Sequence, residues 1–285
     1  MNAAAAGTLR LNSNSIFNYL KGQICRKILI LLQKLNTLFI GKVLLTFPEL
    51  SSTNAYAIEL LSKSRPIEGT VISTANQTHG RGQIDSKWIS APQKNLTCST
   101  ILYPQFLEVK HQFYLNMATS MAAMETIQHF LPNQKCEIKW PNDLNIDGLK
   151  IGGILIQNAL QGQHIQSSII GLGINVLQTK FPQNIPNATS MMLQNPEFSF
   201  SVENVLFAFC QNLEKRYLQL KSGKYSSLKD SYLKHLLGLE EDREFEKPDG
   251  SRFFGRITGI SEDGRIVLNT SGEIQYFNLK EIAFL

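Results

Sequence analysis

Short apolar runs typical of strands recur along most of this chain, and apolar repeats at helical spacing lie between them. The strand-like runs occupy residues 43–47, 70–75, 96–102, 137–147, 151–160 and 166–177. Helical spacing follows the capping residues 51–54, recurs from about residue 112 to 130, and returns between 201 and 237. The pattern predicts a domain of strands and helices that begins near residue 43.

The pattern changes after Gly238. Short alternating runs are separated by turn sequences, two of which are the dipeptides Asp249-Gly250 and Asp263-Gly264. An Asp-Gly pair between alternating runs is a strong signal for a β-hairpin. We therefore expect a small β-barrel over residues 238–285.

The first 42 residues have a different character. Apolar residues from Ile24 to Phe39 recur at helical spacing with basic residues between them, which predicts an amphipathic helix. This segment could be an organellar transit peptide or a membrane-surface helix, but an accessory or poorly ordered extension is the simpler interpretation. Because no uninterrupted apolar run reaches about 18 residues, we expect no membrane span.

Charge and cysteine content narrow the possible functions. Of the 28 basic residues, six lie in residues 1–48, where there is no acidic residue, so the rest of the chain is close to neutral. A near-neutral body has no general basic face for nucleic acid. The four cysteines are far apart and form no Cys-x-x-Cys pair, which disfavours a zinc site or a disulfide framework and favours a reducing compartment.

Candidate chemistry lies in polar and glycine-rich blocks that adjoin the strand-like runs. The blocks are Gly80-Arg81-Gly82 in a long polar loop, Lys139-Trp140-Pro141-Asn142-Asp143, Lys150-Ile151-Gly152-Gly153, and Gly171-Leu172-Gly173-Ile174-Asn175. Each block alone is compatible with an ordinary turn or bulge. Their combination indicates a sheet lined with ligand-contacting residues. The chain has neither a dinucleotide-binding glycine fingerprint nor a Gly-x-x-x-x-Gly-Lys-Ser/Thr phosphate loop.

These blocks, in order and together with Ser52-Thr53-Asn54, Gln77 and Trp88, resemble the biotin protein ligase family. The resemblance covers roughly residues 43–285. It implies an α/β (α+β) catalytic domain with a mixed sheet, related to class II aminoacyl-tRNA synthetases, over residues 43–237, followed by an SH3-like barrel over 238–285. It also implies a two-step reaction, in which biotin and ATP form biotinyl-5′-AMP and a lysine of a biotin carboxyl carrier protein then takes the biotinyl group.

The resemblance also assigns roles to individual residues. Arg81 and Lys150 are the expected catalytic residues, because a carboxylate and a phosphate repel each other unless cations stand between them. The expected biotin-binding residues are Ser52, Thr53, Asn54, Gln77, Gly80, Arg81, Gly82, Gln83, Lys150, Gly152 and Gly153. The expected nucleotide-binding residues are Arg81, Trp88, Lys139, Asn142 and Asn175. Asp143 is the expected ligand of Mg²⁺, the metal that accompanies ATP.

One position departs from the family pattern, and several alternatives stay open. Gln83 stands where a second arginine is often found, so retention of the adenylate could be weaker, or Lys87 could compensate.

The alternatives to a biotin protein ligase are a lipoate–protein ligase, a biotin-responsive transcriptional regulator and an inactive biotin-binding paralogue. Since only about 42 residues precede the domain, we expect a monofunctional enzyme that does not bind DNA. The expected partner is the biotin carrier of acetyl-CoA carboxylase. The expected location is the cytoplasm, or an organelle if residues 1–42 are a transit peptide.

Overall fold

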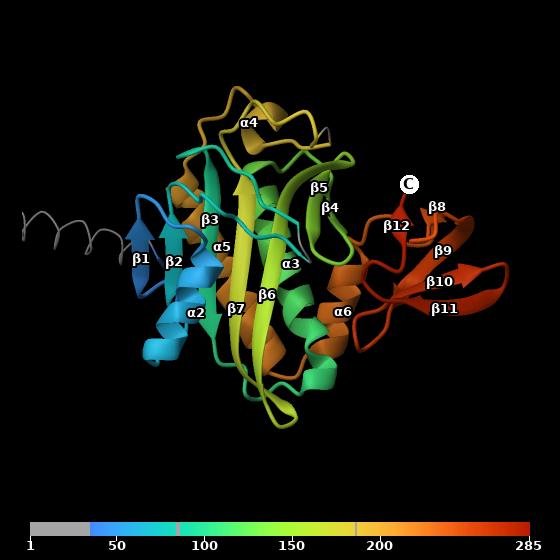
Figure 1. Ribbon diagram of the computed structural model, residues 1–285, viewed down its shortest axis with the longest axis horizontal. Coiled ribbons are helices and arrows are strands. Elements are labelled where there is room, and N and C mark those ends of the chain that lie inside the picture. Colours follow the sequence, from blue (N-terminus) through green and yellow to red (C-terminus); the bar gives the residue numbers. More distant parts are fainter. Residues whose placement is uncertain (1–34, 84–85, 186) are drawn as a thin grey trace, which may run out of the picture. The chain divides into compact units, whose positions relative to one another are not determined.

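A seven-stranded sheet is the largest element of the fold (Figure 1). This computed structural model describes residues 35–83, 86–185 and 187–285, and all elements below belong to the compact unit that runs from Thr37 to Leu285. The strands are β1 (Leu44–Phe47), β2 (Val71–Thr74), β3 (Asn95–Leu102), β4 (Cys136–Lys139), β5 (Asp143–Ile146), β6 (Leu149–Gln161) and β7 (His164–Asn175). They are arranged in the order β1-β2-β3-β7-β6-β5-β4. Because β1 pairs with β2 in parallel and every other pair is antiparallel, the expected mixed sheet is confirmed.

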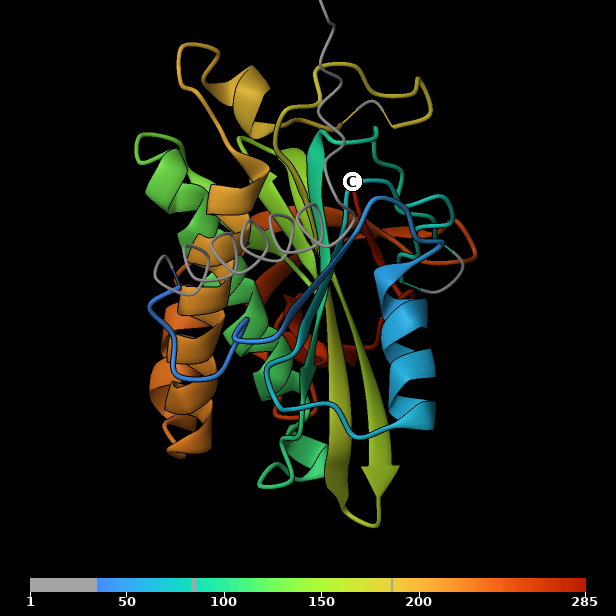
Figure 2. The ribbon, with the colours of Figure 1, turned by 90° about the vertical axis from the view of Figure 1, so that its left-hand side faces the viewer.

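Helices cover both faces of this sheet. Helix α2 (Thr53–Lys63) lies on one face, and α3 (Phe113–Phe130), α5 (Val202–Lys221) and α6 (Tyr225–Leu233) lie on the other (Figures 1 and 2). A helix with apolar and small residues on all sides belongs in a protein interior. This composition explains why α3 is buried along most of its length, with α5 packed against it. The described residues also form two short helices, η1 (Val109–His111) and α4 (Met191–Gln194).

A second, five-stranded antiparallel sheet follows α6. Its strands are β8 (Asp242–Glu246), β9 (Arg252–Ile260), β10 (Ile266–Thr270), β11 (Glu273–Phe277) and β12 (Ala283–Phe284). Both Asp-Gly dipeptides stand in hairpin turns, between β8 and β9 and between β9 and β10. The expected fold class, a mixed α/β domain followed by a small antiparallel β-structure, is therefore confirmed.

The single strand expected over residues 137–147 is wrong. The segment is a hairpin, in which β4 and β5 pair with Lys139 opposite Asp143. The turn between them holds Trp140, whose peptide bond to Pro141 is cis. The chain therefore reverses between β4 and β5, where one continuous strand was expected.

The helix expected from Ile24 to Phe39 extends too far. Residues 1–34 lie outside the described residues, but Leu38 and Phe39 form a bend. Their backbone N–H groups donate to the carboxylate of Glu214 at 2.5 and 2.7 Å, and Ile40 N donates to it at 2.9 Å. A buried carboxylate that accepts three backbone N–H groups stabilises the bend over a further helical turn.

Candidate active site

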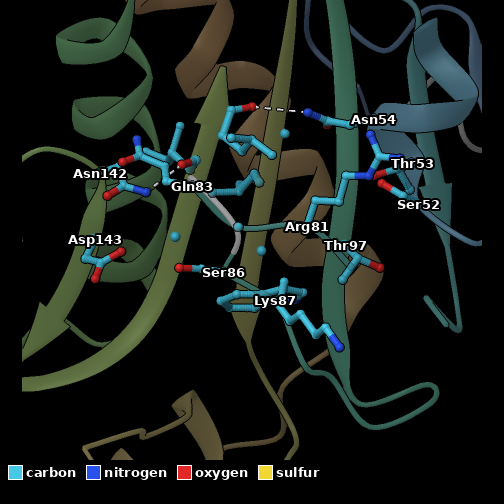
Figure 3. Close-up of a pocket in the computed structure, with 18 of the residues that line it drawn as sticks. Ser52, Thr53, Asn54, Arg81, Gln83, Ser86, Lys87, Thr97, Asn142 and Asp143 are labelled. Atoms are coloured by element: carbon cyan, nitrogen blue, oxygen red, sulfur yellow. Dashed lines mark hydrogen bonds between the residues drawn. The ribbon is translucent and has the colours of Figure 1, made fainter. Parts of the chain in front are cut away.

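A cavity of about 260 Å³ opens on the α2 face of the main sheet (Figure 3). Its walls come from the start of α2, the polar loop after β2, strands β3, β6 and β7, and the β4–β5 hairpin. Most of the expected site residues line it: Ser52, Thr53, Asn54, Gln77, Arg81, Gly82, Gln83, Trp88, Asn142, Asp143, Lys150 and Gly153. Segments far apart in the sequence thus converge on one cavity.

The N-terminus of α2 forms one wall. Ser52 caps the helix, since its side chain accepts a hydrogen bond from Ala55 N. Gln77 Oε1 accepts from Thr53 N at 2.9 Å, so the glutamine holds the loop against the first helical turn. The positive end of a helix favours anions and hydrogen-bond acceptors. This wall therefore suits a ligand that carries a carbonyl or a carboxylate.

Asn54 is a fixed polar group on the cavity wall. Its Nδ2 donates to Gln157 Oε1 at 2.8 Å, and its Oδ1 accepts from Ser99 Oγ at 2.6 Å. Ser99 Oγ also lies 2.7 Å from Thr53 Oγ1, so the two hydroxyls and the amide form one connected network. A Cβ at Gly171 would lie 2.4 Å from Asn54 Oδ1, so the glycine makes room for the amide.

The polar loop folds back over the cavity as a small hairpin. Trp88 N donates to Gly80 O at 3.0 Å and Gly82 N donates to Ser86 O at 2.7 Å, so the backbones of Arg81 and Lys87 form an isolated antiparallel β-bridge. The indole of Trp88 lies against β7, where a Cβ at Gly173 would come within 2.4 Å of its ring. Trp88 Nε1 is buried and has no hydrogen-bond partner among the described residues. The glycine thus provides the space in which the indole lies.

A lysine–aspartate pair forms the opposite wall. Lys150 Nζ lies 2.6 Å from Asp143 Oδ1, and both side chains are partly exposed to the cavity. The neighbouring Asn142 is fixed by β6, since its Nδ2 donates to Ile154 O at 2.8 Å. Figure 3 shows Asn142 and Asp143 on one side of the cavity and Arg81, Ser52 and Thr53 on the other. Cationic groups therefore stand on both sides.

Residues 46–175 match the biotin/lipoate A/B protein ligase family. This segment is a domain of that family. The matched range includes every cavity wall described so far.

Related proteins and solved structures agree with this family. The bifunctional ligase/repressor BirA of Bacillus subtilis is 29% identical over 243 residues, which are 85% of this chain and 74% of that protein. The biotin–[acetyl-CoA-carboxylase] ligase of Mycobacterium tuberculosis is 25% identical over 82% of this chain and 86% of its own. The biotin protein ligase from Aquifex aeolicus, solved with biotin and ATP, has a TM-score of 0.71 and 24% identity over 86% of this chain and 99% of its own. At that identity the likeness concerns the fold.

Four residues expected from the family pattern lie outside the cavity lining. They are Gly80, Lys139, Gly152 and Asn175. Asn175 is buried, and its Nδ2 donates to Thr189 O at 2.9 Å. Lys139 points to the C-terminal sheet, where its Nζ lies 5.2 Å from the centre of the Phe284 ring. Burial lowers the pKa of Lys139, and the attraction of Asp143 opposes this shift.

Several cavity residues were missed by the sequence analysis. Thr97 and Cys98 lie on β3, where polar and apolar residues are mixed and no block of glycines or charged residues marks a ligand-facing side. Burial raises the pKa of the Cys98 thiol well above its ordinary value, so Cys98 is a neutral wall residue and not a nucleophile. Leu279 and Lys280 come from the C-terminal sheet, and their role depends on a tertiary contact that no local motif announces.

Within the described ranges, none of the helices combines the length and the apolar character needed to cross a membrane.

Proposed function

We propose that this protein is an ATP-dependent biotin–protein ligase. In the first step a carboxylate oxygen of biotin attacks the α-phosphorus of ATP. A P–O bond forms to the carboxylate, and the bond to the β-phosphate oxygen breaks, giving biotinyl-5′-AMP and pyrophosphate. In the second step the amine of a carrier lysine attacks the acyl carbon, loses a proton and displaces AMP.

The observation that carries the proposal is one cavity with a helix N-terminus and fixed amides on one side and cations on both sides. Two anions must meet in the first step, and their repulsion grows as water leaves the site. Arg81 and Lys150 neutralise the carboxylate and the charge that develops on the phosphate. Asp143 holds Lys150 at 2.6 Å and so positions its ammonium group before the substrates bind.

The α2 wall suits the head group of biotin, a cyclic urea that carries one carbonyl oxygen and two N–H groups. The proton of Ser52 Oγ and the positive helix end favour the carbonyl. Asn54 Oδ1 has a second lone pair beyond the one that accepts from Ser99, and this lone pair is available to a urea N–H. The apolar atoms of Ile154, Leu155 and Leu172 wall the ring and the tail.

The loop and the β4–β5 hairpin are the proposed nucleotide side. The indole of Trp88 supplies a flat apolar face for adenine, and the paired segments 80–82 and 86–88 cover the reactive adenylate against water. Lys139 and Asn175 lie outside the lining, so their proposed contribution is to support the walls that touch the nucleotide.

Mg²⁺ accompanies ATP in this proposal. One carboxylate plus substrate phosphates and water is a typical donor set for Mg²⁺, and Asp143 lines the cavity with a partly exposed carboxylate. Asn142 offers a further oxygen, because its hydrogen bond to Ile154 uses the amide nitrogen. When bound, the ion neutralises phosphate charge. Asp143 and Asn142 would hold it.

The proposed acceptor is the biotin carboxyl carrier domain of acetyl-CoA carboxylase, in keeping with the name of the Mycobacterium tuberculosis relative. A cytoplasmic location is part of the proposal, or an organellar one if residues 1–42 are a transit peptide. The absence of DNA binding stays a prediction, because residues 1–34 lie outside the described residues. The oligomeric state is open.

The test is the intact mass of a purified biotin carrier domain after incubation with this protein, biotin and Mg-ATP. We expect one biotinyl adduct that requires ATP and the acceptor lysine. The controls are a carrier with that lysine changed to alanine, and a parallel reaction with lipoate and its own carrier. Attachment of lipoate without attachment of biotin would overturn the proposal in favour of a lipoate–protein ligase.

A further inference from the structure

A turn of the C-terminal sheet reaches the cavity. The turn joins β11 to β12, and its residues Leu279 and Lys280 line the cavity beside the polar loop and the lysine–aspartate pair. Apart from this turn, the cavity walls come from residues 52–173. The C-terminal sheet therefore contributes one cationic side chain to the site.

The turn is rigid. Glu281 N donates to Asn278 O at 3.1 Å, which closes a four-residue β-turn. The carboxylate of Glu281 accepts in return from Asn278 N at 2.6 Å and from Asn278 Nδ2 at 3.1 Å. These hydrogen bonds fix the backbone on both sides of Lys280.

Lys280 occupies a backbone conformation that favours glycine. It is the third residue of the turn and has φ +67°, whereas φ of Leu279 is not positive, which is the pattern of a type II turn. Glycine is the usual residue at that position because a Cβ is disfavoured there. Five non-glycine residues of the described chain have positive φ, and of these Lys280 lines the cavity. An unfavourable conformation kept at a ligand site points to a use for the side chain.

The cavity has a place for this charge. Gln83 lines the same cavity at the position where the family pattern often has a second arginine. An adenylating site must hold a triphosphate, and cations aligned along it stabilise both the substrate and the departing pyrophosphate. Lys280 adds a cation to those of Arg81, Lys87 and Lys150 from a wall that the sequence motifs do not cover.

We propose that Lys280 binds the phosphate groups of ATP and supplies the positive charge that Gln83 lacks. The inference rests on the proposed adenylating function and assigns a nucleotide-binding residue to the C-terminal sheet. Lys280 touches the reacting nucleotide in the first step, so its substitution affects adenylation before it affects transfer to the carrier.

The experiment is biotin-dependent exchange of labelled pyrophosphate into ATP, which reports the first step alone. We expect Lys280→Ala to raise KM for ATP about tenfold, to leave KM for biotin within about twofold, and Lys280→Arg to recover most of the loss. Lys280→Gly removes the charge and also relieves the backbone, so it should lose ATP affinity like Lys280→Ala.

The matched control is Lys247→Ala. Lys247 is the other lysine of residues 238–285 and lies over the Phe253 ring, away from the cavity lining, so its removal should leave both KM values unchanged. An unchanged KM for ATP in Lys280→Ala would overturn the proposal. Normal exchange with slow transfer to the carrier would also overturn it and assign Lys280 to the carrier.

Failure of the proposed function gives a different result. If the wild type shows no biotin-dependent exchange, that function falls. Calorimetric titration of the wild type and Lys280→Ala with Mg-ATP alone still compares their nucleotide affinities. Weaker binding to the variant would then keep Lys280 as a phosphate ligand of another ATP-using enzyme, whereas equal binding would remove both proposals.

Discussion

At the scale of single residues, the cavity walls are held by hydrogen bonds that exist before any ligand binds. Asn54 is fixed by Gln157 and Ser99, and Thr53 is fixed by Gln77. Such fixed polar groups meet a ligand with little further loss of side-chain freedom. The two glycines of β7 contribute to this arrangement by leaving space for Asn54 and Trp88.

These two glycines allow the two halves of the cavity to be tested separately. In Gly173→Ala the new Cβ displaces the indole of Trp88, and in Gly171→Ala it displaces the amide of Asn54. Overpacking of this kind costs about 1–3 kcal/mol. We expect Gly173→Ala to weaken ATP binding about tenfold or more and Gly171→Ala to weaken biotin binding by a similar factor.

The two variants serve as controls for each other, since they lie two residues apart on the same strand. Titration calorimetry with biotin and with Mg-ATP measures both affinities in each variant. If both variants lost affinity for the same ligand, the division of the cavity into a biotin side and a nucleotide side would be wrong.

Gln83 is a further residue to test, because it lines the cavity without the positive charge of the arginine that the family pattern often has there. In Gln83→Arg a guanidinium adds a charge-assisted contact to the adenylate. We expect release of biotinyl-5′-AMP into solution to slow about tenfold. Gln83→Met is the uncharged control of similar length. Chromatography of the filtrate after a single turnover measures the release, and equal rates in Gln83→Arg and wild type would contradict the expectation.

At the scale of elements, the β4–β5 hairpin connects the cavity to the C-terminal sheet. Trp140 in its turn donates Nε1–H to Gly264 O at 2.9 Å. Gly264 has φ +94° and packs so closely on Phe113 of α3 that a Cβ would lie 2.4 Å from the ring. The β9–β10 turn is therefore fitted against both the hairpin and α3. Leu279 and Lys280 reach the cavity from the same sheet.

Gly264→Ala should disturb this contact more than a backbone effect alone explains. The new Cβ meets Phe113, and alanine is also disfavoured at the positive φ of this position. We expect a loss of about 2–4 kcal/mol in the free energy of unfolding and a higher KM for ATP. The matched control is Gly250→Ala, which has φ +81° but open space around the Cβ, so it should lose only about 1 kcal/mol.

Chemical denaturation of the two alanine variants gives the comparison. Equal losses of stability would mean that the contact between Gly264 and Phe113 contributes nothing.

The elements and motifs of this chain differ in how far the sequence predicts them. Apolar periodicity predicts α3 and β7 well, because burial follows directly from the pattern. It fails at Trp140-Pro141, where the chain reverses within a run of strand-like residues. Apolar periodicity also gives no sign that Lys280 lies at the cavity. The C-terminal sheet reaches the cavity through contacts between distant segments, such as that of Trp140 with Gly264. Motifs identify residues that touch a ligand, whereas supporting contacts are identified by the structure.

At the scale of the whole unit from Thr37 to Leu285, the segment that leads from α6 into the C-terminal sheet carries a titratable group. Ile138 N donates to His235 O at 2.8 Å, and Leu237 N donates to Ile138 O at 2.9 Å. His235 is therefore held beside β4 at the edge of the main sheet. Burial lowers the pKa of His235 below its ordinary value of 6.5, and the attraction of Glu125 offsets this only in part.

This shift fixes the sign of the pH dependence. Above about pH 6.5 the imidazole is neutral in both states, and as the pH falls the unfolded chain takes up a proton first. Stability that is present above the unfolded pKa is then lost as the pH falls toward the folded pKa.

We expect the free energy of unfolding to fall between pH 7.5 and about pH 5.5, and to fall less steeply in His235→Gln. The control is His164→Gln, at an exposed position at the start of β7, and urea denaturation across this range supplies the slopes. Because acidic residues elsewhere titrate in both proteins, the difference between the His235→Gln slope and the wild-type slope isolates the imidazole. Parallel slopes would mean that His235 is solvated as well in the folded protein as in the unfolded chain, and that the segment from α6 to the C-terminal sheet does not bury it.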